Sequence, residues 1–422
     1  MSTLKELIQQ YCPDGVEYRP IWSLTAWDKK FNGIDKSKQK KVIKYNYLLA
    51  ADLKSYQVEG GTVKLLTTNI SNLYTTEELA EDLASDGEVV AIPWGGNPIV
   101  QYYKGRFLTA DNRIATSLDT TLLSNKFLYY CMLSKMDIIA SFYRGSGIKH
   151  PEMAKVLDLE IPVPPLPVQE EIVRILDNFA ELQAELQAEL QKRLQQYNYY
   201  RDKLLTFNDL NGGGYAVSVE WKKLGEIGVF YGGLSGKTKE DFKDGNAKFI
   251  SYKNVFYNLS LNVDTDERVK IAEGEKQNTV QYGDVLFTGS SETPDECGMS
   301  SVLTQKTDEK LYLNSFCFGY RLHNPSQFCL DFLKHLFRSS EIRKQIGKTA
   351  SGTTRFNVSK KRFAEVSIPI PPLAVQKQIA DILDKFYTLT ADLTEGLPAE
   401  IEARRKQYEY YRDQLLTFKQ KA

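Results

Sequence analysis

The sequence contains few of the residues that build most catalytic and metal centres. It has three histidines and five cysteines in 422 residues. The cysteines form no Cys-x-x-Cys pair and no zinc spacing, and an odd, scattered set indicates reduced thiols in a cytosolic protein. No serine, cysteine or aspartate pattern surrounds the histidines, so a nucleophile–histidine pair is not predicted. We expect neither a catalytic residue nor a metal site in this chain.

Long apolar runs and a net charge are also missing. No segment approaches 18 uninterrupted apolar residues, and the N-terminal residues lack the apolar run of a signal peptide. We therefore expect a soluble, cytoplasmic chain. The 54 Lys and Arg residues balance the 54 Asp and Glu residues, so no global basic field indicates nucleic acid. Local clusters would have to supply any phosphate contact.

The familiar nucleotide and methyltransferase motifs are incomplete. Gly232 to Thr238 resembles a phosphate-binding loop but is one residue short of the motif, which favours an ordinary surface loop. A methyltransferase would need a Gly-rich cofactor turn and an Asn-Pro-Pro-aromatic tetrapeptide. Asn97-Pro98-Ile99 and Asn324-Pro325-Ser326 come nearest, and neither fits. The chain is not predicted to be an enzyme.

A long internal repeat is present. Ile161-Pro-Val-Pro-Pro-Leu166 matches Ile368-Pro-Ile-Pro-Pro-Leu373, and each match continues through a glutamine three residues later. Further on, the segment at 199–207 matches that at 410–418 with the pattern Tyr-Tyr-Arg-Asp-x-Leu-Leu-Thr-Phe. A repeat of this length indicates one architectural unit used twice.

Each proline-rich turn is followed by the pattern of a long helix. After Pro165 the apolar residues recur in three- and four-residue steps as far as Leu204, which predicts one continuous amphipathic helix. At about 1.5 Å per residue, roughly 39 residues would extend about 58 Å. The second helix carries the same stripe, but Gly396 and Pro398 predict a kink or local break within it.

The first helix contains a tetrapeptide repeat. Ala180-Glu-Leu-Gln183 recurs at Ala184 and again at Ala188. One interpretation is a solvated coiled coil filled with good helix formers. The other is an adjustable spacer, because one tetrapeptide changes the helix length by about 6 Å and its phase by only about 40°. The periodicity alone leaves both open.

Before each helix lies a globular segment of mixed pattern, rich in β-branched and aromatic residues. The openings match at Val16-Glu17-Tyr18 and Val219-Glu220-Trp221, and Ser146-Gly147 and Ser351-Gly352 precede the two proline turns. We predict an α+β fold in which two mixed α/β domains alternate with two long coiled-coil helices as an internal repeat. The expected domains are a short N-terminal helix with a first globular domain at 1–160, a turn and long helix at 161–210, a second globular domain at 211–367, and a turn and distal helix at 368–422.

Positive charge is concentrated in a few local clusters. No acidic residue occurs from Ile342 to Ala364, and the corresponding stretch from Ile138 to Pro151 is also free of acids. Lysine clusters are most often solvated loops, but two at equivalent positions of a repeat favour phosphate contact. The candidate DNA-binding residues are Lys29, Lys30, Lys36, Lys38, Lys40, Lys41, Arg144, Lys149, Lys237, Lys239, Arg343, Lys344, Lys348, Thr353, Thr354, Arg355, Lys360, Lys361 and Arg362.

Taken together, the doubled Ile-Pro-x-Pro-Pro-Leu-x-x-Gln turns, the doubled helix ends, the Ser-Gly loops and the Ala-Glu-Leu-Gln run resemble the specificity subunit of type I restriction–modification systems. The resemblance covers essentially the whole chain. It implies two target-recognition domains, each reading one half of a bipartite, asymmetric DNA site. The two helices would pack antiparallel, which would give the chain pseudo-twofold symmetry, and would set the spacer between the halves. It also implies that the short helix near Leu4 to Tyr11 lies at the C-terminal end of the second helix.

The resemblance further implies partners. Two adenine methyltransferase subunits would dock on the helices, and restriction subunits would join through them. S-adenosylmethionine, ATP and Mg would belong to those subunits, with no cofactor in this chain. The candidate partner-binding residues are the helix-stripe residues Ile172, Ile175, Phe179, Leu182, Leu186, Leu190, Leu194, Tyr197, Ile379, Phe386, Leu389, Leu393, Ile401 and Tyr408.

An alternative from another class is a coiled-coil adaptor that holds two protein-binding domains and contacts no DNA. The neutral net charge favours it, whereas the paired acid-free stretches do not.

Overall fold

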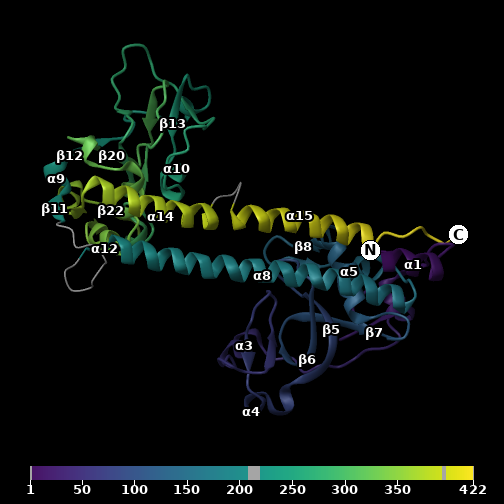
Figure 1. Ribbon diagram of the computed structural model, residues 1–422. Helices are drawn as coiled ribbons and strands as arrows, with labels where there is room; N and C mark the ends of the chain where they lie inside the picture. Colours follow the sequence, from purple (N-terminus) through teal and green to yellow (C-terminus); the bar gives the residue numbers. More distant parts are fainter. Residues whose placement is uncertain (1, 208–218, 392–395, 422) are drawn as a thin grey trace. The chain divides into compact units, whose positions relative to one another are not determined.

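The computed structural model describes residues 2–207, 219–391 and 396–421 (Figure 1). The chain forms two compact units, of which unit 1 is made from two separate stretches of sequence and unit 2 from one, and each includes parts of both long helices. Unit 1 comprises residues 1–185 and 402–422, and unit 2 comprises residues 186–401. No helix within the described ranges is both long and apolar enough to cross a membrane.

Unit 1 is built on a six-stranded mixed sheet with strand order β2-β7-β5-β6-β3-β4. All neighbours pair antiparallel except β3 and β6, which run parallel. The central strands carry continuous buried runs such as Val89 to Ile92, as expected of strands covered on both faces. The strands are β2 (Thr25–Trp27), β3 (Val63–Leu66), β4 (Tyr74–Thr75), β5 (Ser85–Pro93), β6 (Gln101–Thr109) and β7 (Asn112–Ser117).

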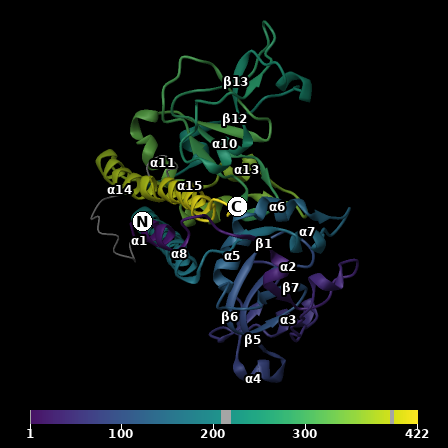
Figure 2. The same ribbon diagram turned by 90° about the vertical axis from the view of Figure 1, so that its right-hand side faces the viewer.

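Short helices complete unit 1, and α5 lies against the sheet (Figure 2). Phe127, Leu128 and Met132 of α5 are fully buried in one core with Val90 and Ile92 of β5. The helices are α1 (Ser2–Tyr11), α2 (Ile21–Leu24), α3 (Ala50–Ser55), α4 (Glu77–Ala80), α5 (Asn125–Ser134), α6 (Met136–Ser141) and α7 (Met153–Leu157).

Unit 2 contains two four-stranded sheets, β12-β20-β16-β18 and β14-β13-β19-β15. The second of these lies farther from α14 in both views (Figures 1 and 2). The strands are β12 (Gly228–Gly232), β13 (Ala247–Ile250), β14 (Arg268–Val269), β15 (Thr279–Val280), β16 (Val285–Thr288), β18 (Ser300–Val302), β19 (Leu311–Leu313) and β20 (Cys317–Leu322). The helices are α9 (Leu224–Ile227), α10 (Tyr252–Tyr257), α11 (Leu330–Leu336), α12 (Ser340–Gly347) and α13 (Lys360–Phe363).

The two units share one topology. The order β2-β7-β5 in unit 1 corresponds to β12-β20-β16 in unit 2, and the parallel pair β3–β6 corresponds to the parallel pair β13–β19. Each nine-residue central strand of unit 1 is represented by two short strands in unit 2, namely β15 with β16 and β18 with β19. The same framework therefore forms a continuous sheet in unit 1 and two separate sheets in unit 2. The repeated α+β architecture was predicted, whereas the division of the sheet was not.

The first long helix is continuous. α8 (Leu166–Leu205) has 40 residues, which confirms the helix predicted after the first proline turn. Its residues 166–185 belong to unit 1 and its residues 186–205 to unit 2, so the division falls within the Ala-Glu-Leu-Gln run.

The second long helix is interrupted, as predicted from its glycine and proline. α14 (Leu373–Ala391) precedes the break and α15 (Leu397–Leu415) follows it, with a bend at Gly396. Pro398 lies in the first turn of α15, where the missing backbone N–H has no intrahelical partner to lose. Leu393 lies outside the described residues.

A buried glutamine fixes the start of each long helix. The Gln169 amide group donates to the carbonyl oxygens of Leu122 and Pro164, both at 2.7 Å, and its oxygen accepts from the Ser124 N–H at 2.9 Å. Gln376 makes the same three kinds of bond in unit 2, as donor to Gln327 and Pro371 and as acceptor from Cys329. These bonds tie each proline turn to the domain before it, which explains the glutamine in the repeated motif.

Aromatic side chains join the helix segments within each unit. Phe179 of α8 stacks on Tyr411 of α15 in unit 1, with centroids 5.6 Å apart and planes at 22°. Phe386 of α14 stacks on Tyr200 of α8 in unit 2 at 5.5 Å and 17°. Phe179 and Phe386 are repeat equivalents, as are Tyr411 and Tyr200, so one contact is made twice. The second tyrosine of each Tyr-Tyr motif is therefore a packing residue.

The N-terminal segment closes unit 1 against the C-terminal segment. Val16 donates to the Lys419 carbonyl at 2.8 Å and accepts from the Lys421 N–H at 3.0 Å. Leu4 of α1 shares the core with Leu416, and Figure 1 shows α1 beside the C-terminal segment. This confirms the predicted position of the N-terminal helix. Antiparallel pairs β1 (Tyr18–Pro20) with β10 (Glu160–Pro162), and β11 (Glu220–Lys223) with β23 (Ser367–Ile370), close the two domains.

Candidate nucleic-acid interface

Each unit carries a short hairpin just before its proline turn. In unit 1 it joins β8 (Tyr143–Arg144) to β9 (His150–Pro151), and in unit 2 it joins β21 (Ala350–Ser351) to β22 (Phe356–Val358). The pairs Arg144↔His150 and Ser351↔Asn357 lie 207 positions apart, the offset of the proline turns. The hairpins are therefore equivalent structures.

Glycine shapes both hairpins at the same place. Gly145 has φ +144° and Gly352 has φ +152°, and a Cβ there would approach the carbonyl oxygens of Ile148 and Arg355 at 2.6 Å and 2.0 Å. Only glycine accommodates both restrictions without strain. The structural equivalents are thus Gly145 and Gly352, whereas the sequence match of Gly147 with Gly352 is two residues out of register.

Each hairpin is attached to the end of a central strand of its own unit. In unit 1 the Gly96 N–H donates to the Lys149 carbonyl at 3.0 Å, and the His150 Nδ1 lies 2.7 Å from the Trp94 carbonyl oxygen. In unit 2 β22 pairs with β17 (Ser290–Ser291), which follows β16 directly. Both tips are consequently held on a rigid sheet, which favours a defined contact with a ligand.

A cationic and aromatic cluster surrounds the unit 1 hairpin. The Arg113 guanidinium lies 4.2 Å from the centroid of the Trp94 ring and 3.7 Å from the Asp28 carboxylate. Burial raises the pKa of Asp28 and lowers the pKa of Arg113. The Lys29 ammonium lies over the same ring, 5.9 Å from its centroid. The tryptophan therefore links a buried ion pair to an exposed lysine beside the hairpin.

Most of the predicted basic residues of unit 1 are exposed. Lys29, Lys30, Lys36, Lys40 and Lys41 are in this state, as are Arg144 and Lys149 of the hairpin. Two have carboxylate partners: Lys38 lies 2.6 Å from Asp158, and Arg144 lies 3.3 Å from Glu152. The structure thus brings Lys29, Arg144 and Lys149 to the unit 1 hairpin and the adjoining Trp94. The other predicted basic residues of unit 1 lie on the segment that precedes α3.

The predicted basic cluster of unit 2 is divided among several places. Arg343 points into the domain, where it donates to the carbonyl oxygens of Asp295 and Cys297 at 2.6 Å, and burial lowers its pKa to about 10. Lys237 donates to Glu275, whose pKa is held at about 2 by this and other hydrogen bonds. Arg343 and Lys237 therefore have structural roles that their sequence neighbourhood did not indicate. Lys239 remains exposed.

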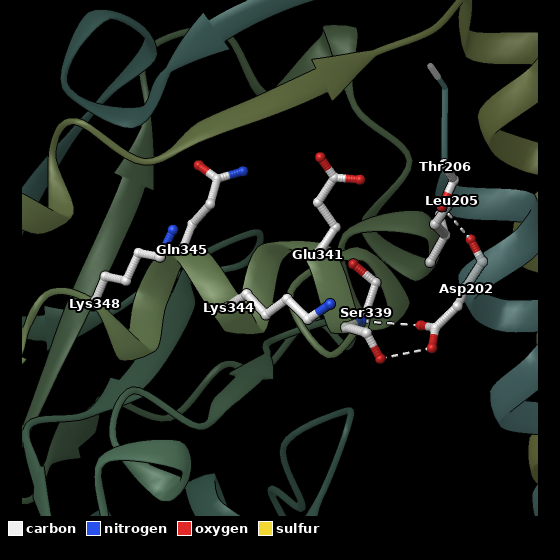
Figure 3. Close-up of a pocket in the computed structure, with 9 residues that line it drawn as sticks. Asp202, Leu205, Thr206, Ser339, Glu341, Lys344, Gln345 and Lys348 are labelled. Atoms are coloured by element: carbon white, nitrogen blue, oxygen red, sulfur yellow. Dashed lines mark hydrogen bonds between the residues drawn. The ribbon is translucent and has the colours of Figure 1, made fainter. Parts of the chain in front are cut away.

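Lys344 of α12 and Lys348, the residue that follows this helix, line a cavity of about 440 Å³ at the end of α8 (Figure 3). There the Asp202 carboxylate accepts hydrogen bonds from the Ser340 N–H at 2.9 Å and hydroxyl at 2.6 Å. Burial opposes ionisation of Asp202, but the bonds from Arg201 and Ser340 lower its pKa overall. The aspartate of the repeated Tyr-Tyr-Arg-Asp motif thus binds the start of α12. Its equivalent, Asp413, lines a smaller cavity of about 190 Å³ in unit 1.

The remaining candidates lie at the hairpin and just beyond it. Thr353, Thr354 and Arg355 form the exposed tip, and Thr354 and Arg355 line a second cleft of unit 2. Lys360, Lys361 and Arg362 are exposed on α13, which directly follows β22. The equivalent hairpin residue of Arg355 is Ile148, whose side chain is 70% exposed. Ile148 carries no charge, so the charge pattern did not indicate it. Its place after Gly145 and Gly147 and before Lys149 was the only feature of the sequence that marked it as a hairpin-tip residue.

Part of the predicted partner-binding stripe is engaged within the units. Ile172, Ile379 and Tyr197 are buried in the cores. Ile175, Phe179, Leu182, Leu186, Leu190, Leu194, Phe386, Ile401 and Tyr408 are half-buried, and Leu389 is exposed. In the described parts of these helices, the most exposed large apolar side chains are instead Tyr199 and Tyr410, at 60% and 62%. They are repeat equivalents, and the partner-binding residues predicted from the apolar stripe include neither of them.

The comparisons with known proteins follow the same division of the chain. The family model described as type I restriction modification DNA specificity domain matches twice, at residues 29–196 and 217–403. The EcoR124I/EcoR124II specificity subunit of Escherichia coli is 33% identical over 72% of this chain and 74% of its own length. A putative type I restriction enzyme specificity subunit of Haemophilus influenzae is 33% identical, over 81% of this chain and 86% of its own.

Solved structures show the same fold. A type I restriction–modification S subunit from M. genitalium covers 95% of this chain and 96% of its own, with a TM-score of 0.55 and 15% identity. A chain from a study of complex assembly and conformational transition of the type I R-M system covers 96% and 98%, with a TM-score of 0.54 and 15% identity. No comparison supports the adaptor alternative. The chain belongs to the type I restriction–modification specificity subunits, and its role is DNA recognition within such a system.

Proposed function

We propose that units 1 and 2 each read one half of a bipartite, asymmetric DNA site. The observation that carries this proposal is the pair of equivalent hairpins, which one framework presents with different side chains. Ile148 and Arg355 occupy the same hairpin position but offer an apolar surface and a guanidinium. Two copies of one reader with unlike contact residues would recognise two unlike sequences.

We also propose that the long helices set the distance between the half-sites. α8 contributes to both units, and the three Ala-Glu-Leu-Gln tetrapeptides occur where one unit gives way to the other. Deleting Ala184 to Gln187 would shorten the helix by about 6 Å. The spacer of the recognised site should then change, while both half-sites stay the same.

The proposed partners are two adenine methyltransferase subunits, joined by restriction subunits. Repeat symmetry supports two equivalent docking surfaces, because Tyr199 and Tyr410 are exposed at equivalent positions of the two helix ends. Exposed tyrosines supply large contact area at low entropic cost and are frequent anchors in protein interfaces. S-adenosylmethionine, ATP and Mg would be bound by those partners, and this chain would contribute recognition without catalysis.

Mapping adenine methylation across a genome tests this function. Cells carrying this chain together with its methyltransferase should show a two-part methylated motif, and the motif should disappear when this chain alone is deleted. The deletion of Ala184 to Gln187 is then compared in the same cells. Methylation that persists unchanged without the chain, while the methyltransferase is expressed, would refute the proposed function.

A further inference from the structure

A cleft of about 530 Å³ in unit 2 lies beside the hairpin tip. One wall is α10, with Tyr252, Lys253, Phe256 and Tyr257, and the opposite side consists of β17, the segment after it and the hairpin residues Thr354 and Arg355. We propose that this cleft is the base-reading site of unit 2 and that Arg355 contacts the guanine of a G·C pair there. This inference rests on the proposed DNA-reading function and assigns it to particular residues.

The first argument is the availability of the Arg355 side chain. Its Nε donates to the Ser290 hydroxyl at 3.2 Å and its guanidinium lies 5.2 Å from the Phe316 ring centroid. Among the described residues no carboxylate pairs with it. Arg321, by contrast, is held by Asp284, and Arg338 donates to backbone carbonyls of α10 and β18. Arg355 thus keeps its two terminal nitrogens for a ligand, and guanine O6 and N7 match that fork.

The second argument is that the cleft is rigid. Arg338 donates to the carbonyl oxygens of Val255 and Phe256 and so fixes the end of α10. The Tyr252 hydroxyl donates to the Ser290 carbonyl at 2.8 Å, which ties α10 to β17. The opposite side is fixed by the β17–β22 pairing. Arg355 is therefore oriented before DNA arrives, and little freedom is lost on binding.

The third argument concerns which part of DNA the cleft suits. Glu292 and Glu296 also line it, and both carboxylates are exposed. Carboxylates repel phosphate but accept hydrogen bonds from the N4 amino group of cytosine. The Glu296 carboxylate is positioned by hydroxyl donors from Ser291 at 3.1 Å and Thr293 at 3.0 Å. A guanidinium and a positioned carboxylate that line one cleft match the edge of a G·C pair better than the uniformly negative backbone.

The aromatic residues extend this surface. Tyr252 stacks on Phe256 with centroids 5.8 Å apart and planes at 22°, whereas Tyr257 is 71% exposed and Phe316 is 56% exposed. Exposed aromatic side chains next to a guanidinium exclude water from the contact and strengthen the charge-assisted bonds. Unit 1 has Ile148 at the equivalent position, so the same contact is not predicted for its half-site.

The test uses the purified complex of this chain with its methyltransferase subunits. Its two-part motif is first taken from the methylation map, and binding is then measured against duplexes in which each base pair is replaced in turn. The wild-type complex should discriminate against replacement of one G·C pair by about 5- to 150-fold. With Arg355→Ala, that discrimination should fall to near unity in one half-site only, while the other positions keep theirs.

Two further variants separate base reading from charge and folding. Arg355→Lys keeps the positive charge but loses the fork, so it should lose the same discrimination with little loss of overall affinity. Arg268→Ala removes an exposed arginine elsewhere in unit 2 and should leave discrimination unchanged.

Wild-type discrimination at every position in the Arg355 variants would overturn the inference, as would a uniform loss at all positions in both of them. Either result leaves the proposed function standing, since the two-part motif would still be present. A wild-type complex without any two-part motif would instead refute the function itself.

Discussion

At the scale of single residues, the repeat explains which side chains serve the fold. Gln169 and Gln376, Phe179 and Phe386, and Asp202 and Asp413 are pairs of equivalents, and the glutamines and phenylalanines repeat their contacts in both units. The sequence showed that these residues recur but not what they bind. Charge was a weaker guide still. Arg343 stands among exposed cations in the sequence, yet its side chain enters the domain, because sequence position does not give side-chain direction.

One equivalent pair differs in chemistry and predicts a pH effect. In unit 2 His335 is fully buried, with Nε2 2.7 Å from Asp384 and Nδ1 3.0 Å from the Tyr197 hydroxyl. In unit 1 the corresponding residue is Tyr130, which donates to Asp177 at 2.6 Å. Burial lowers the pKa of His335, although Asp384 opposes that shift. The Lys334 ammonium, 2.8 Å from Asp384, adds to the lowering.

The histidine should make unit 2 less stable in mild acid. The unfolded chain takes up a proton near the ordinary histidine pKa of 6.5, whereas the folded unit takes it up only at lower pH. The free energy of unfolding should therefore fall as pH drops below about 6.5, by at most about 1.4 kcal/mol per pH unit. His335→Tyr, which copies unit 1, should weaken this dependence. Urea unfolding of both proteins from pH 7.5 to 5.5 measures it, and equal pH slopes would contradict the assignment.

At the scale of elements, prediction from sequence was strongest for the helices and weakest for the strands. The stripe of apolar residues gave α8, and Gly396 with Pro398 gave the break between α14 and α15. The two globular segments matched at their ends and at one strand-like stretch, residues 87–92 with residues 283–288, and differed widely between these matches. Their shared topology was hidden because the long strands β5 and β6 of unit 1 become pairs of short strands in unit 2. Strand pairing depends on distant partners, which local patterns do not reveal.

The hairpins give an element-scale prediction with a matched control. Gly145→Ala would place a Cβ 2.6 Å from the Ile148 carbonyl at a φ of +144°, so the tip of the unit 1 hairpin should distort at a cost of about 1–3 kcal/mol. Gly147→Ala in the same hairpin meets nothing within 4 Å and has ordinary φ. Methylation mapping should therefore show weakened recognition of one half-site for the first variant and normal recognition for the second. Equal behaviour of the two would show that the hairpin shape does not matter for reading.

At the scale of the whole molecule, the chain is an internal repeat of one fold, and the two units share the long helices. Each unit combines its own globular segment with the start of one long helix and the end of the other. The doubled motifs were sufficient to predict this organisation and the family. They were not sufficient to predict the proposed base-reading residues, because the hairpin tips differ in sequence where the framework agrees. The residues that repeat and the residues that differ therefore lie in different parts of each unit.

The most direct test of two equivalent readers is to use one of them twice. The strand pairs at Tyr18↔Pro162 and Trp221↔Pro369 provide matching boundaries, so residues 19–161 can be replaced by residues 222–368. In complex with the methyltransferase, this chain should methylate a symmetric motif in which the half-site of unit 2 occurs twice in inverted orientation. A methylated motif that retains the original half-site of unit 1 would contradict the account.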